Sequence, residues 1–581
     1  MYFLLCYVLL LYSVSALWPE PRDYELGSSV LWLSSDVKIS FAPPVQSQTL
    51  RWLWKPIQNF IPLFEDEYGA SQSDGHTLSE DLLSAAFERM KHNTLKRSYV
   101  PQKFHPRRAV FEPPANGSQT FIREISIEES VQEDLGEAAY ILKISEAGTA
   151  LINTASSSGG LHAFETFSQL FFAHSAPTVG AYTPFAPVSI RDSPAFNHRG
   201  LNLDISRNWI APGDVMRTIE AMAANKLNRL HIHASDAQSW PLEIPALPDL
   251  AIMGAYSPSQ IWRTEDLEAV QRHGKSYGVE VFIEIDLPGH TTSIGNAYPQ
   301  LITAKDEPWA KYSVEPPSGQ LRLNSSDVPS FLDTLLHDLL SRTSQHSRFF
   351  HLGGDELNLD AYSIDPSVNS SSREVLQPLV QSLIDQVISI AKSYGLIVIM
   401  WEEMILDWDL NLPNDIIVQT WRGSQNNPLA AILGKGHQVL FGSNAYWYLD
   451  CGHGTFLDLE PSNPVSPIAP PYLDYCSPYK NWRHMHAYNP LDGIPEDQQQ
   501  LVIGGEAHLW GELTDSVNLD DMLWPRVAAA AEVMWSGSGK KPDEGTTRRL
   551  ADMRERLVIR GIRAGVVQME WCLRHEGGCT L

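Results

Sequence analysis

The chain has 581 residues, more than one hydrophobic core usually holds, so at least two domains are expected. Its formal charge of −26 repels nucleic acid and anionic lipid, so neither nucleic acid nor a membrane is an expected partner. With 43% hydrophobic and 10% aromatic residues, the composition is that of a globular protein and excludes a largely disordered chain.

Residues 1–16 (MYFLLCYVLLLYSVSA) form an apolar run that is short for a membrane span, which needs about 20 residues. Val14 and Ala16 place small side chains at the two specificity positions of a cleavage site after Ala16. These features predict a signal peptide, although a basic start is missing. No later segment is long and apolar enough to span a bilayer, so we expect a soluble, secreted protein in the extracellular space.

Residues 17–97 are expected to be irregular, because the segment contains Pro, Ser and acidic stretches, and to be a propeptide if the chain is cut at the dibasic pair that ends the segment. It ends at the dibasic pair Lys96-Arg97, and a second pair, Arg107-Arg108, follows. In a secreted protein such pairs can be processing sites. A plain exposed basic pair explains each of them equally well.

Residues 98–190 are predicted to form a small N-terminal α+β domain. The stretches 121–130 and 139–146 alternate apolar and polar side chains, as strands do, and residues 158–171 have a helical pattern. The Pro-rich stretch 183–196 (TPFAPVSIRDSPAF) is expected to be a connector.

Residues 191–581 carry apolar runs that largely alternate with helical patterns. The runs are residues 200–206, 228–234, 279–286, 348–354, 396–403, 415–421, 437–447 and 501–510. Continuous apolar runs are typical of parallel strands buried on both faces, and eight of them is the count of a (β/α)8 TIM barrel. A doubly wound open sheet is the alternative, but no Gly-rich phosphate-binding sequence follows the first run. The predicted fold class is therefore α/β, with a (β/α)8 TIM barrel catalytic domain preceded by the small α+β domain.

Carboxylates, histidines and aromatic side chains follow these runs, where the active site of such a barrel lies. They are Asp236, Asp286, His290, Asp355, Glu356, Trp401, Glu402, Trp421, Tyr448, Trp510 and Glu512.

The sharpest signal is HLGGDE, residues 351–356. Two glycines let the backbone turn tightly at a strand end, so that Asp355 and Glu356 project into the barrel mouth. Like charges held close together raise one pKa, so one carboxyl stays protonated while the other is ionised. Acid catalysis requires that division of labour. Taken alone, the sequence is as compatible with a solvated acidic turn.

Two further strand ends carry HIHASDAQSW (231–240) and EIDLPGH (284–290). One interpretation is a hydrolytic metal centre, if the side chains converge on an ion: His231, His233, Asp236, Asp286 and His290. Another is that His290 bridges Asp236 and Glu356 and tunes the acid. A third is a set of buried, hydrogen-bonded polar residues.

Three tryptophans, Trp401, Trp421 and Trp510, lie at or just beyond apolar runs. Core packing is the usual role of tryptophan. Three of them beside polar groups would instead line a pocket, stacking on a sugar or holding an acetamide methyl group.

The cysteines predict two disulfides. Cys6 leaves with the signal peptide, and an even number in an oxidising compartment suggests pairing of the remaining four. Sequence proximity favours Cys451–Cys476 and Cys572–Cys579 among three possible pairings. Since no CxxC spacing occurs, a structural zinc site is not expected. Three sequons are candidate glycosylation sites: Asn116, Asn324 and Asn369.

In combination, these motifs resemble glycoside hydrolase family 20, the β-N-acetylhexosaminidases, and most of all the secreted fungal members. The resemblance covers about residues 110–570 and rests on RGLNLDISRNW, HIHASDAQSWP, EIDLPGH, HLGGDE, LIVIMWEE, VQTW, AYWYLD and GGEAHLWGE. It implies an exo-acting enzyme that removes terminal N-acetylhexosamine (GlcNAc or GalNAc) from chitooligosaccharides and glycans, without a metal or other cofactor. The substrate's own acetamide oxygen would attack, giving an oxazolinium-like intermediate and retention.

The resemblance also implies a role for each site residue. Glu356 would be the general acid and later the base, Asp355 would orient the acetamide nitrogen, and Tyr448 would donate to the acetamide oxygen. The pocket walls would be Trp401, Trp421 and Trp510. The residues binding sugar hydroxyls would be Arg199, Asp450 and Glu512, and those supporting Glu356 would be Asp236 and His290. A homodimer and a propeptide that stays bound non-covalently are implied as well.

Three other functions stay open at this point. One is an enzyme with the same mechanism and another specificity, such as the release of disaccharides. A second is an inactive sugar-binding protein, whose expected signature would be loss of Asp355, Glu356 or Tyr448, and all three are present. The third is a metallohydrolase that uses His231, His233 and Asp236.

Overall fold

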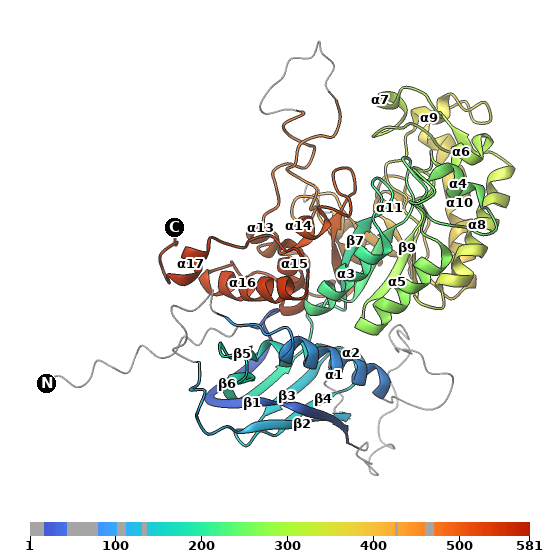
Figure 1. The fold of residues 1–581 in the computed structure, drawn as a ribbon. Coiled ribbons are helices and arrows are strands. Elements are labelled where there is room, and N and C mark those ends of the chain that lie inside the picture. The colour runs from blue at the N-terminus through green and yellow to red at the C-terminus, as the bar shows by residue number, and fades with distance from the viewer. Residues whose placement is uncertain (1–16, 43–78, 102–111, 130–135, 424–427, 459–469) are drawn as a thin grey trace. The chain divides into compact units, whose positions relative to one another are not determined.

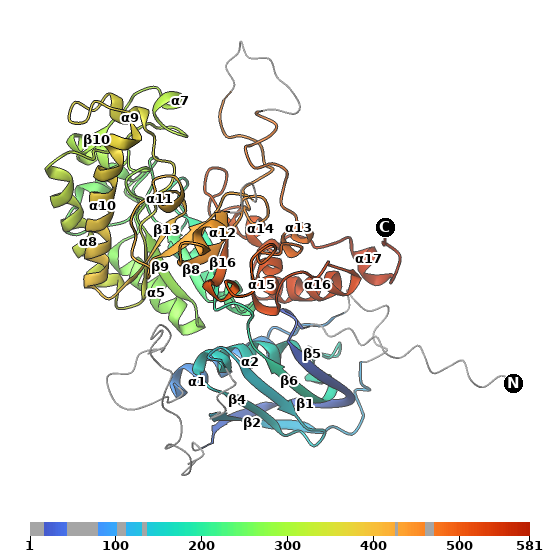
Figure 2. The same cartoon turned by 180° about the vertical axis from the view of Figure 1, so that it is seen from behind.

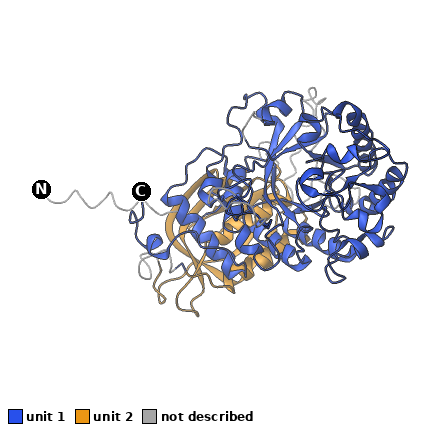
Figure 3. Ribbon diagram, turned by 90° about the horizontal axis from the view of Figure 1, so that it is seen from above, with its two compact units in different colours: residues 1–20, 101–106, 194–581 blue, residues 21–100, 107–193 orange. Residues whose placement is uncertain are grey.

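The computed structural model describes residues 17–42, 79–101, 112–129, 136–423, 428–458 and 470–581, in two compact units (Figure 3). Unit 1 comprises residues 1–20, 101–106 and 194–581, and unit 2 comprises residues 21–100 and 107–193. The predicted signal peptide and the pair Arg107-Arg108 lie outside the described residues. Within the described ranges, no helix has both the length and the apolar character that a bilayer crossing requires.

Unit 2 is a six-stranded sheet with two helices on one face (Figure 1). In the order in which they pair, the strands are β1 (Asp23–Phe41), β2 (Phe121–Glu129), β4 (Ala150–Thr154), β3 (Tyr140–Ile144), β6 (Ala181–Asp192) and β5 (Phe172–Ala173). The helices are α1 (Glu80–Leu95) and α2 (Ser157–Gln169). Leu83, Phe87 and Met90 recur at helical spacing on the buried face of α1, and the Phe87 ring packs 6.1 Å from that of Phe164 on α2.

The expectation that residues 17 to about 100 are irregular is wrong for two stretches, which form β1 and α1. Strand β1 pairs in parallel with β2 and antiparallel with β6. Its partners lie far away in the sequence, with Trp32 paired to Phe121 in β2 and to Tyr182 in β6, so no local pattern predicts the pairing. The segment predicted to be a propeptide therefore contributes a strand and a helix to unit 2, while cleavage after Arg97 stays a prediction.

The stretch expected to be a Pro-rich connector forms most of β6. The register between β1 and β6 shifts on both sides of the pair Ser29–Ala186. Pro184 and Pro187 lie at these two shifts, where a missing N–H group costs no ladder hydrogen bond. The prolines are compatible with a strand here because the ladder is already irregular.

Unit 1 is a closed barrel of parallel strands, as predicted (Figures 1 and 2). The eight expected apolar runs each overlap one strand: β7 (His198–Asp204), β8 (Arg229–His233), β9 (Glu280–Glu284), β12 (Phe349–His351), β13 (Ile397–Trp401), β14 (Ile417–Thr420), β15 (Gln438–Phe441) and β16 (Val502–Leu509). Pairing of β16 with β7 closes the barrel.

Helices follow most strands of the barrel. The longer ones are α3 (Pro212–Ala224), α5 (Thr264–Tyr277), α8 (Asp327–Thr343), α10 (Arg373–Ser393), α15 (Arg526–Ser536) and α16 (Glu544–Ile559). Shorter ones are α4 (Asp249–Gly254), α6 (Ile294–Ala297), α7 (Trp309–Tyr312), α9 (Asp360–Ser363), α11 (Glu403–Leu406), α12 (Pro428–Leu433), α13 (Trp482–His486), α14 (Leu519–Leu523) and α17 (Glu570–Arg574). Helix α5 ends at Gly278, whose φ of 74° suits glycine.

The side chains inside the barrel change from apolar to polar along the strands. An apolar cluster comprises Phe282, Phe349, Ile399, Ile417, Leu440 and Ile503. Two positions further along four of these strands are Glu284, His351, Trp401 and Gln419, all buried. Alternate residues of a strand share one face, so the second set points inward as well. The polar set lies toward the carboxyl ends of the strands.

The first described residues of unit 1 dock on its last long helices. The indole nitrogen of Trp18 donates to the carbonyl oxygen of Ala528 at 3.1 Å. The amide of Glu20 donates to Glu532 at 2.8 Å, and His486 and Arg549 contact the same carboxylate. A buried carboxylate therefore ties this N-terminal stretch to α13, α15 and α16.

Candidate active site

The HLGGDE turn leaves β12 through a backbone that only glycine can follow. Gly353 has a φ of 78°, and a Cβ atom there would lie 1.9 Å from an oxygen of Asp286. The amide of Gly354, with a φ of 108°, donates to Oδ1 of Asp286 at 3.0 Å. Glu356 itself has a φ of 51°, a strained conformation for a residue with a side chain. The turn holds Asp355 and Glu356 in fixed and different directions.

Two carboxyl groups at this turn have raised pKa values. Burial raises the pKa of Asp355 to about 6, with Glu356 adding to the rise while His290 opposes it. Burial and the charge of Asp355 raise the pKa of Asp286 well above its usual range. Asp286 is therefore protonated at neutral pH and Asp355 is largely ionised. The sequence predicted such a division between Asp355 and Glu356, whereas in the structure the two raised pKa values belong to Asp355 and Asp286.

His290 lies between Glu356 and a buried carboxylate. Its Nε2 atom is 3.4 Å from Oε2 of Glu356, and its Nδ1 atom is 3.0 Å from Oδ1 of Asp236. Burial lowers the pKa of His290, but the charge of Asp236 and the hydrogen bonds to Asp236 and Glu356 together outweigh burial, and the pKa rises well above the usual value. A protonated imidazole is thus held against Glu356 by an anion behind it.

Arg207, which the sequence analysis did not select, lies at the centre of a group of carboxylates. Its guanidinium is 3.1 Å from Asp204, 3.1 Å from Asp236, 2.7 Å from Glu315 and 3.4 Å from Glu512. It also lies over the Trp510 ring, 5.0 Å from the centroid. One oxygen of Glu512 is buried without a hydrogen-bond partner among the described residues. That oxygen is free to accept a hydrogen bond from a ligand.

The structure does not bring Arg199 to this end of the barrel. Arg199 lies near the start of β7, where its guanidinium donates to the carbonyl oxygens of Lys226 at 2.8 Å and Phe196 at 2.9 Å. It also packs over the Trp535 ring. Active sites of such barrels form at the carboxyl ends of strands, and Arg207 follows the carboxyl end of the same strand β7. The sequence RGLNLDISRNW contains both arginines, and the one that follows the strand, Arg207, could have been identified from its position as the site residue.

Four aromatic side chains form a box beside the turn: Trp401, Trp421, Tyr448 and Trp510. Tyr448 stacks on Trp421, with centroids 6.3 Å apart and planes 19° apart, and it meets Trp510 edge-on at 6.2 Å. Burial and the neighbouring Tyr475 raise the pKa of the Tyr448 hydroxyl well above its usual value, and Asp450 and Asp355 add to the rise. The hydroxyl therefore stays protonated as a donor.

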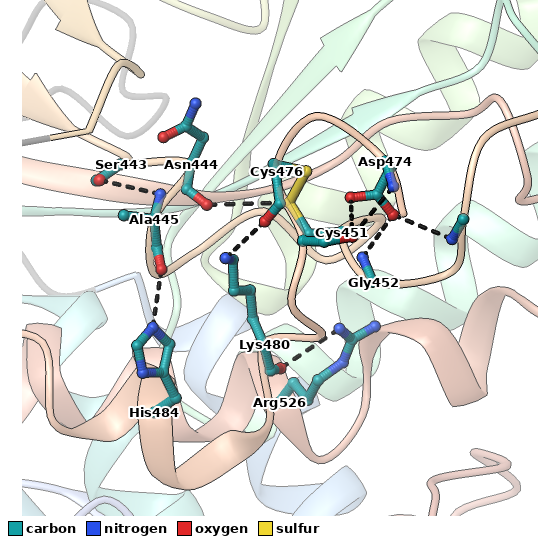
Figure 4. The surroundings of a disulfide bond; sticks show 12 residues. Ser443, Asn444, Ala445, Cys451, Gly452, Asp474, Cys476, Lys480, His484 and Arg526 are labelled. Atoms are coloured by element: carbon teal, nitrogen blue, oxygen red, sulfur yellow. Dashed lines mark hydrogen bonds between the residues drawn. A yellow bond between two sulfur atoms is a disulfide. The ribbon is translucent and has the colours of Figure 1, made fainter. Parts of the chain in front are cut away.

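Both expected disulfides are confirmed, and Cys451–Cys476 belongs to the site. It packs against the aromatic box, and its two cysteines directly follow Asp450 and Tyr475 in the sequence. Lys480 donates to the Cys476 carbonyl at 2.7 Å, and Asp474 accepts from the Gly452 amide at 2.8 Å; Figure 4 draws both hydrogen bonds. Burial raises the pKa of Asp450 to about 7, and one of its oxygens is buried without a hydrogen-bond partner among the described residues.

The sequence analysis selected Glu402 as a site residue, but its neighbour Glu403 is the one that contacts the aromatic box. Glu403 accepts from the indole nitrogen of Trp421 at 2.8 Å, and burial with the charge of Asp355 raises its pKa well above the usual range. Glu402 instead binds Arg422 at 2.6 Å. Glu403 therefore holds a wall of the box, while Glu402 faces an ion pair.

The histidines considered as metal ligands are engaged with carboxylates. Nδ1 of His233 is 2.6 Å from Glu284 and Nε2 is 2.8 Å from Asp236. His231 lies 3.0 Å from Glu284 through one ring nitrogen and 3.0 Å from Glu506 through the other. Hydrogen bonds and ion pairs therefore account for where these rings lie.

The three sequons lie on exposed residues: Asn116 in unit 2, and Asn324 and Asn369 in unit 1. The side-chain amide of Asn324 donates to the carbonyl oxygen of Ser367 at 2.7 Å.

Comparison with known proteins gives two family matches. The catalytic domain of glycosyl hydrolase family 20 matches residues 196–538, and a family described as beta-acetyl hexosaminidase like matches residues 17–170. Beta-hexosaminidase of Arthroderma benhamiae is 47% identical over 597 residues, covering 98% of each chain. Beta-hexosaminidase 1 of Coccidioides posadasii is 31% identical, covering 77% of this chain and 78% of that protein. The second family match includes residues 17–97.

Solved structures share the fold. A chitobiase of Flavobacterium johnsoniae aligns with a TM-score of 0.70 at 22% identity, covering 94% of this chain and 73% of that chain. An exo beta-N-acetylglucosaminidase of Vibrio harveyi aligns with a TM-score of 0.71 at 21% identity, covering 96% of this chain and 79% of that chain. At these identities the likeness concerns the fold alone.

Proposed function

Because the chain belongs to glycosyl hydrolase family 20, we propose that it is a secreted exo-β-N-acetylhexosaminidase acting on chitooligosaccharides and glycans. It removes terminal non-reducing GlcNAc or GalNAc with retention, through an oxazolinium intermediate and without a metal or other cofactor. The observation that carries this proposal is the Asp355-Glu356 pair: two neighbouring carboxyls on one strained turn, one backed by His290 and the other beside an aromatic box.

Adjacent residues of one turn favour participation of the substrate over a protein nucleophile. Classical retention needs two carboxyls on opposite sides of the glycosidic bond. Asp355 and Glu356 are adjacent residues of a single turn, so they are poorly placed to flank that bond from both sides. If the acetamide group of the substrate is the nucleophile, no carboxylate is needed on the opposite face of the sugar. Asp355 can then bind the acetamide nitrogen.

In the first step, Glu356 protonates the glycosidic oxygen while the acetamide oxygen attacks the anomeric carbon, and the bond to the leaving group breaks. Asp355, ionised above pH 6 or so, stabilises the positive charge that develops on the acetamide nitrogen. The Tyr448 hydroxyl donates to the acetamide oxygen. In the second step, the Glu356 carboxylate takes a proton from the water that opens the intermediate.

We propose Arg207, rather than Arg199, as the arginine that binds sugar hydroxyls. The guanidinium of Arg207 contacts Glu512, which carries an oxygen without a partner among the described residues. Asp450 offers a second such oxygen. Burial of these acceptors is costly unless a hydroxyl group completes their hydrogen bonds, so substrate binding gains from both. Trp401, Trp421 and Trp510 wall the sugar and its acetamide.

Secretion agrees with two disulfides and with exposed sequons at Asn116, Asn324 and Asn369. A homodimer and a non-covalently bound segment 17–97 complete the proposal. Residues 17–97 supply β1, α1 and the stretch bound to Glu532, so a cleaved segment would keep extensive contacts.

The test compares 4-nitrophenyl β-GlcNAc with 4-nitrophenyl β-glucoside. The leaving group is the same, and only the acetamide differs. We expect cleavage of the first alone, because the glucoside lacks the internal nucleophile. Equal rates on both, or a sugar trapped covalently on a carboxylate side chain, would refute the mechanism.

A further inference from the structure

Glu284, the last residue of β9, is completely buried in the barrel, and the function proposed above assigns it no role. Its Oε2 atom lies 2.6 Å from Nδ1 of His233 and 3.0 Å from Nε2 of His231. Its Oε1 atom accepts a hydrogen bond from the indole nitrogen of Trp401 at 2.8 Å. One carboxylate therefore contacts a wall of the aromatic box through one oxygen and a histidine through the other.

The contact between Glu284 and His233 continues through further side chains to Glu356, the proposed general acid. Nε2 of His233 lies 2.8 Å from Oδ2 of Asp236, whose other oxygen is 3.0 Å from Nδ1 of His290. His290 in turn lies 3.4 Å from Glu356. Carboxylate and imidazole alternate without a gap from Glu284 to Glu356, and the chain starts on strands β9 and β8, which hold side chains more rigidly than loops do.

The charges agree with this geometry. Burial raises the pKa of Glu284, but the charges of His233, His351 and His231 outweigh burial and hold the pKa well below its usual range. Burial lowers the pKa of His233, but the charge of Glu284 and the hydrogen bonds to Asp236 and Glu284 together raise it well above the usual value. An anion thus fixes a protonated His233, which donates to Asp236.

Other titratable groups surround this pair. His351 has its Nδ1 atom 3.2 Å from Glu284 but accepts there from the Gly353 amide, and burial lowers its pKa. The remaining charged or titratable neighbours, on other strands and on the turn, are Asp204, Asp286, Asp355, Glu506 and His508.

We propose that Glu284 is a positioning residue. Its single buried carboxylate keeps the Asp236–His290–Glu356 chain and the Trp401 ring at fixed positions relative to each other. The inference rests on the proposed function, since it assumes that Glu356 delivers the proton. A carboxylate suits this task because its two oxygens are held in one plane and each accepts hydrogen bonds. The proton donor and the acetamide pocket then keep their separation during the reaction.

The experiment compares Glu284→Gln with Glu506→Gln. Glu506 is equally buried and equally placed among imidazoles, 2.7 Å from His198 and 3.0 Å from His231. It contacts neither His233 nor Trp401 in the described structure. Both substitutions remove one negative charge from the same barrel interior, so a general loss of stability affects both.

The readout is the ratio of kcat/KM on 4-nitrophenyl β-GlcNAc to kcat/KM on N,N′-diacetylchitobiose. The ratio does not depend on the fraction of folded enzyme, and the disaccharide alone needs strong protonation of its leaving group. General acid catalysis contributes on the order of 10² to 10⁴-fold, so partial misalignment in Glu284→Gln should raise the ratio about tenfold. Glu506→Gln should change it less than about twofold by the same reasoning.

An unchanged ratio in Glu284→Gln, or an equal change in both variants, overturns the proposal. Should Glu284→Gln fail to fold, His233→Gln cuts the acid chain and leaves the Trp401 contact intact, and it must raise the ratio similarly. Glu356→Gln serves as the reference. If Glu356→Gln leaves the ratio unchanged, the proposed function itself has failed and this inference falls with it.

Discussion

The guanidinium of Arg207 lies 3.1 Å from Oδ2 of Asp236 and 3.4 Å from Glu512, so one side chain links the carboxylate behind His290 with a carboxylate free to bind a ligand. The planar fork of arginine serves several acceptors at once, and lysine offers a single point charge. Arg207→Lys should therefore reduce kcat/KM by roughly 100-fold, corresponding to about two lost charge-assisted hydrogen bonds.

Arg199→Lys is the matched control for this prediction. Arg199 donates to backbone carbonyls at the other end of β7, so its loss should lower the melting temperature and leave the kcat/KM of the folded enzyme within about threefold of the parent, as for a change remote from the site. Steady-state kinetics and thermal unfolding of both variants check the pair. A larger catalytic loss in Arg199→Lys would reverse the assignment.

The pKa of about 6 for Asp355 predicts an acidic limb in the rate profile. Burial raises this pKa, and the anion is the form that stabilises the acetamide, so kcat/KM on 4-nitrophenyl β-GlcNAc should fall about tenfold per pH unit below pH 6. In Asp355→Asn the limb at this pH should disappear, with a much lower rate above it. Persistence of the same limb in that variant would assign the titration to another group.

The disulfide Cys451–Cys476 should matter for binding, because it packs against the aromatic box next to Asp450 and Tyr475. Replacing both cysteines with serine frees Asp450, and we expect KM to rise about tenfold with a smaller change in kcat, as when one polar contact is lost. The double serine variant of Cys572 and Cys579 is the control, since that pair closes a short loop near the C-terminus. Equal KM values for the two variants would contradict the prediction.

Glu532 should stabilise unit 1. Burial raises its pKa, but Arg549 and His486 outweigh burial and lower it to about 2. A lowered pKa means stability that is present above pH 4.5 or so and is lost as the pH falls toward 2. The shift corresponds to roughly 3 kcal/mol, and Glu532→Gln should lower the free energy of unfolding by about that amount at pH 7.

Urea unfolding at pH 7 and pH 3 checks this prediction. The difference between parent and Glu532→Gln should narrow by about half at pH 3, because part of the parent's advantage has then been titrated away. The exposed pair Glu570–Arg574 provides a control, and Glu570→Gln should cost less than about 1 kcal/mol. A difference that stays constant between the two pH values would contradict the linkage.

The barrel was predictable because its strands are buried on both faces, and such strands have continuous apolar sequences. The same logic failed for β1 and β6. β1 takes its partners from segments far away in the chain, and the prolines of β6 are acceptable only because the ladder shifts at Pro184 and Pro187. Pairing between segments that are distant in the chain produces no periodic pattern in the local sequence from which it could be predicted.

The sequence by itself determined the eight-stranded barrel, both disulfide pairings and the turn that carries Asp355 and Glu356, because each depends on local spacing or on the residue types that a motif requires. Only the tertiary structure decided that Arg207 and not Arg199 reaches the mouth, that Asp286 shares a raised pKa with Asp355, and that Glu284 contacts both His233 and Trp401. Those facts depend on distances between side chains of different strands. Closure of the barrel fixes these distances, and no stretch of sequence contains them.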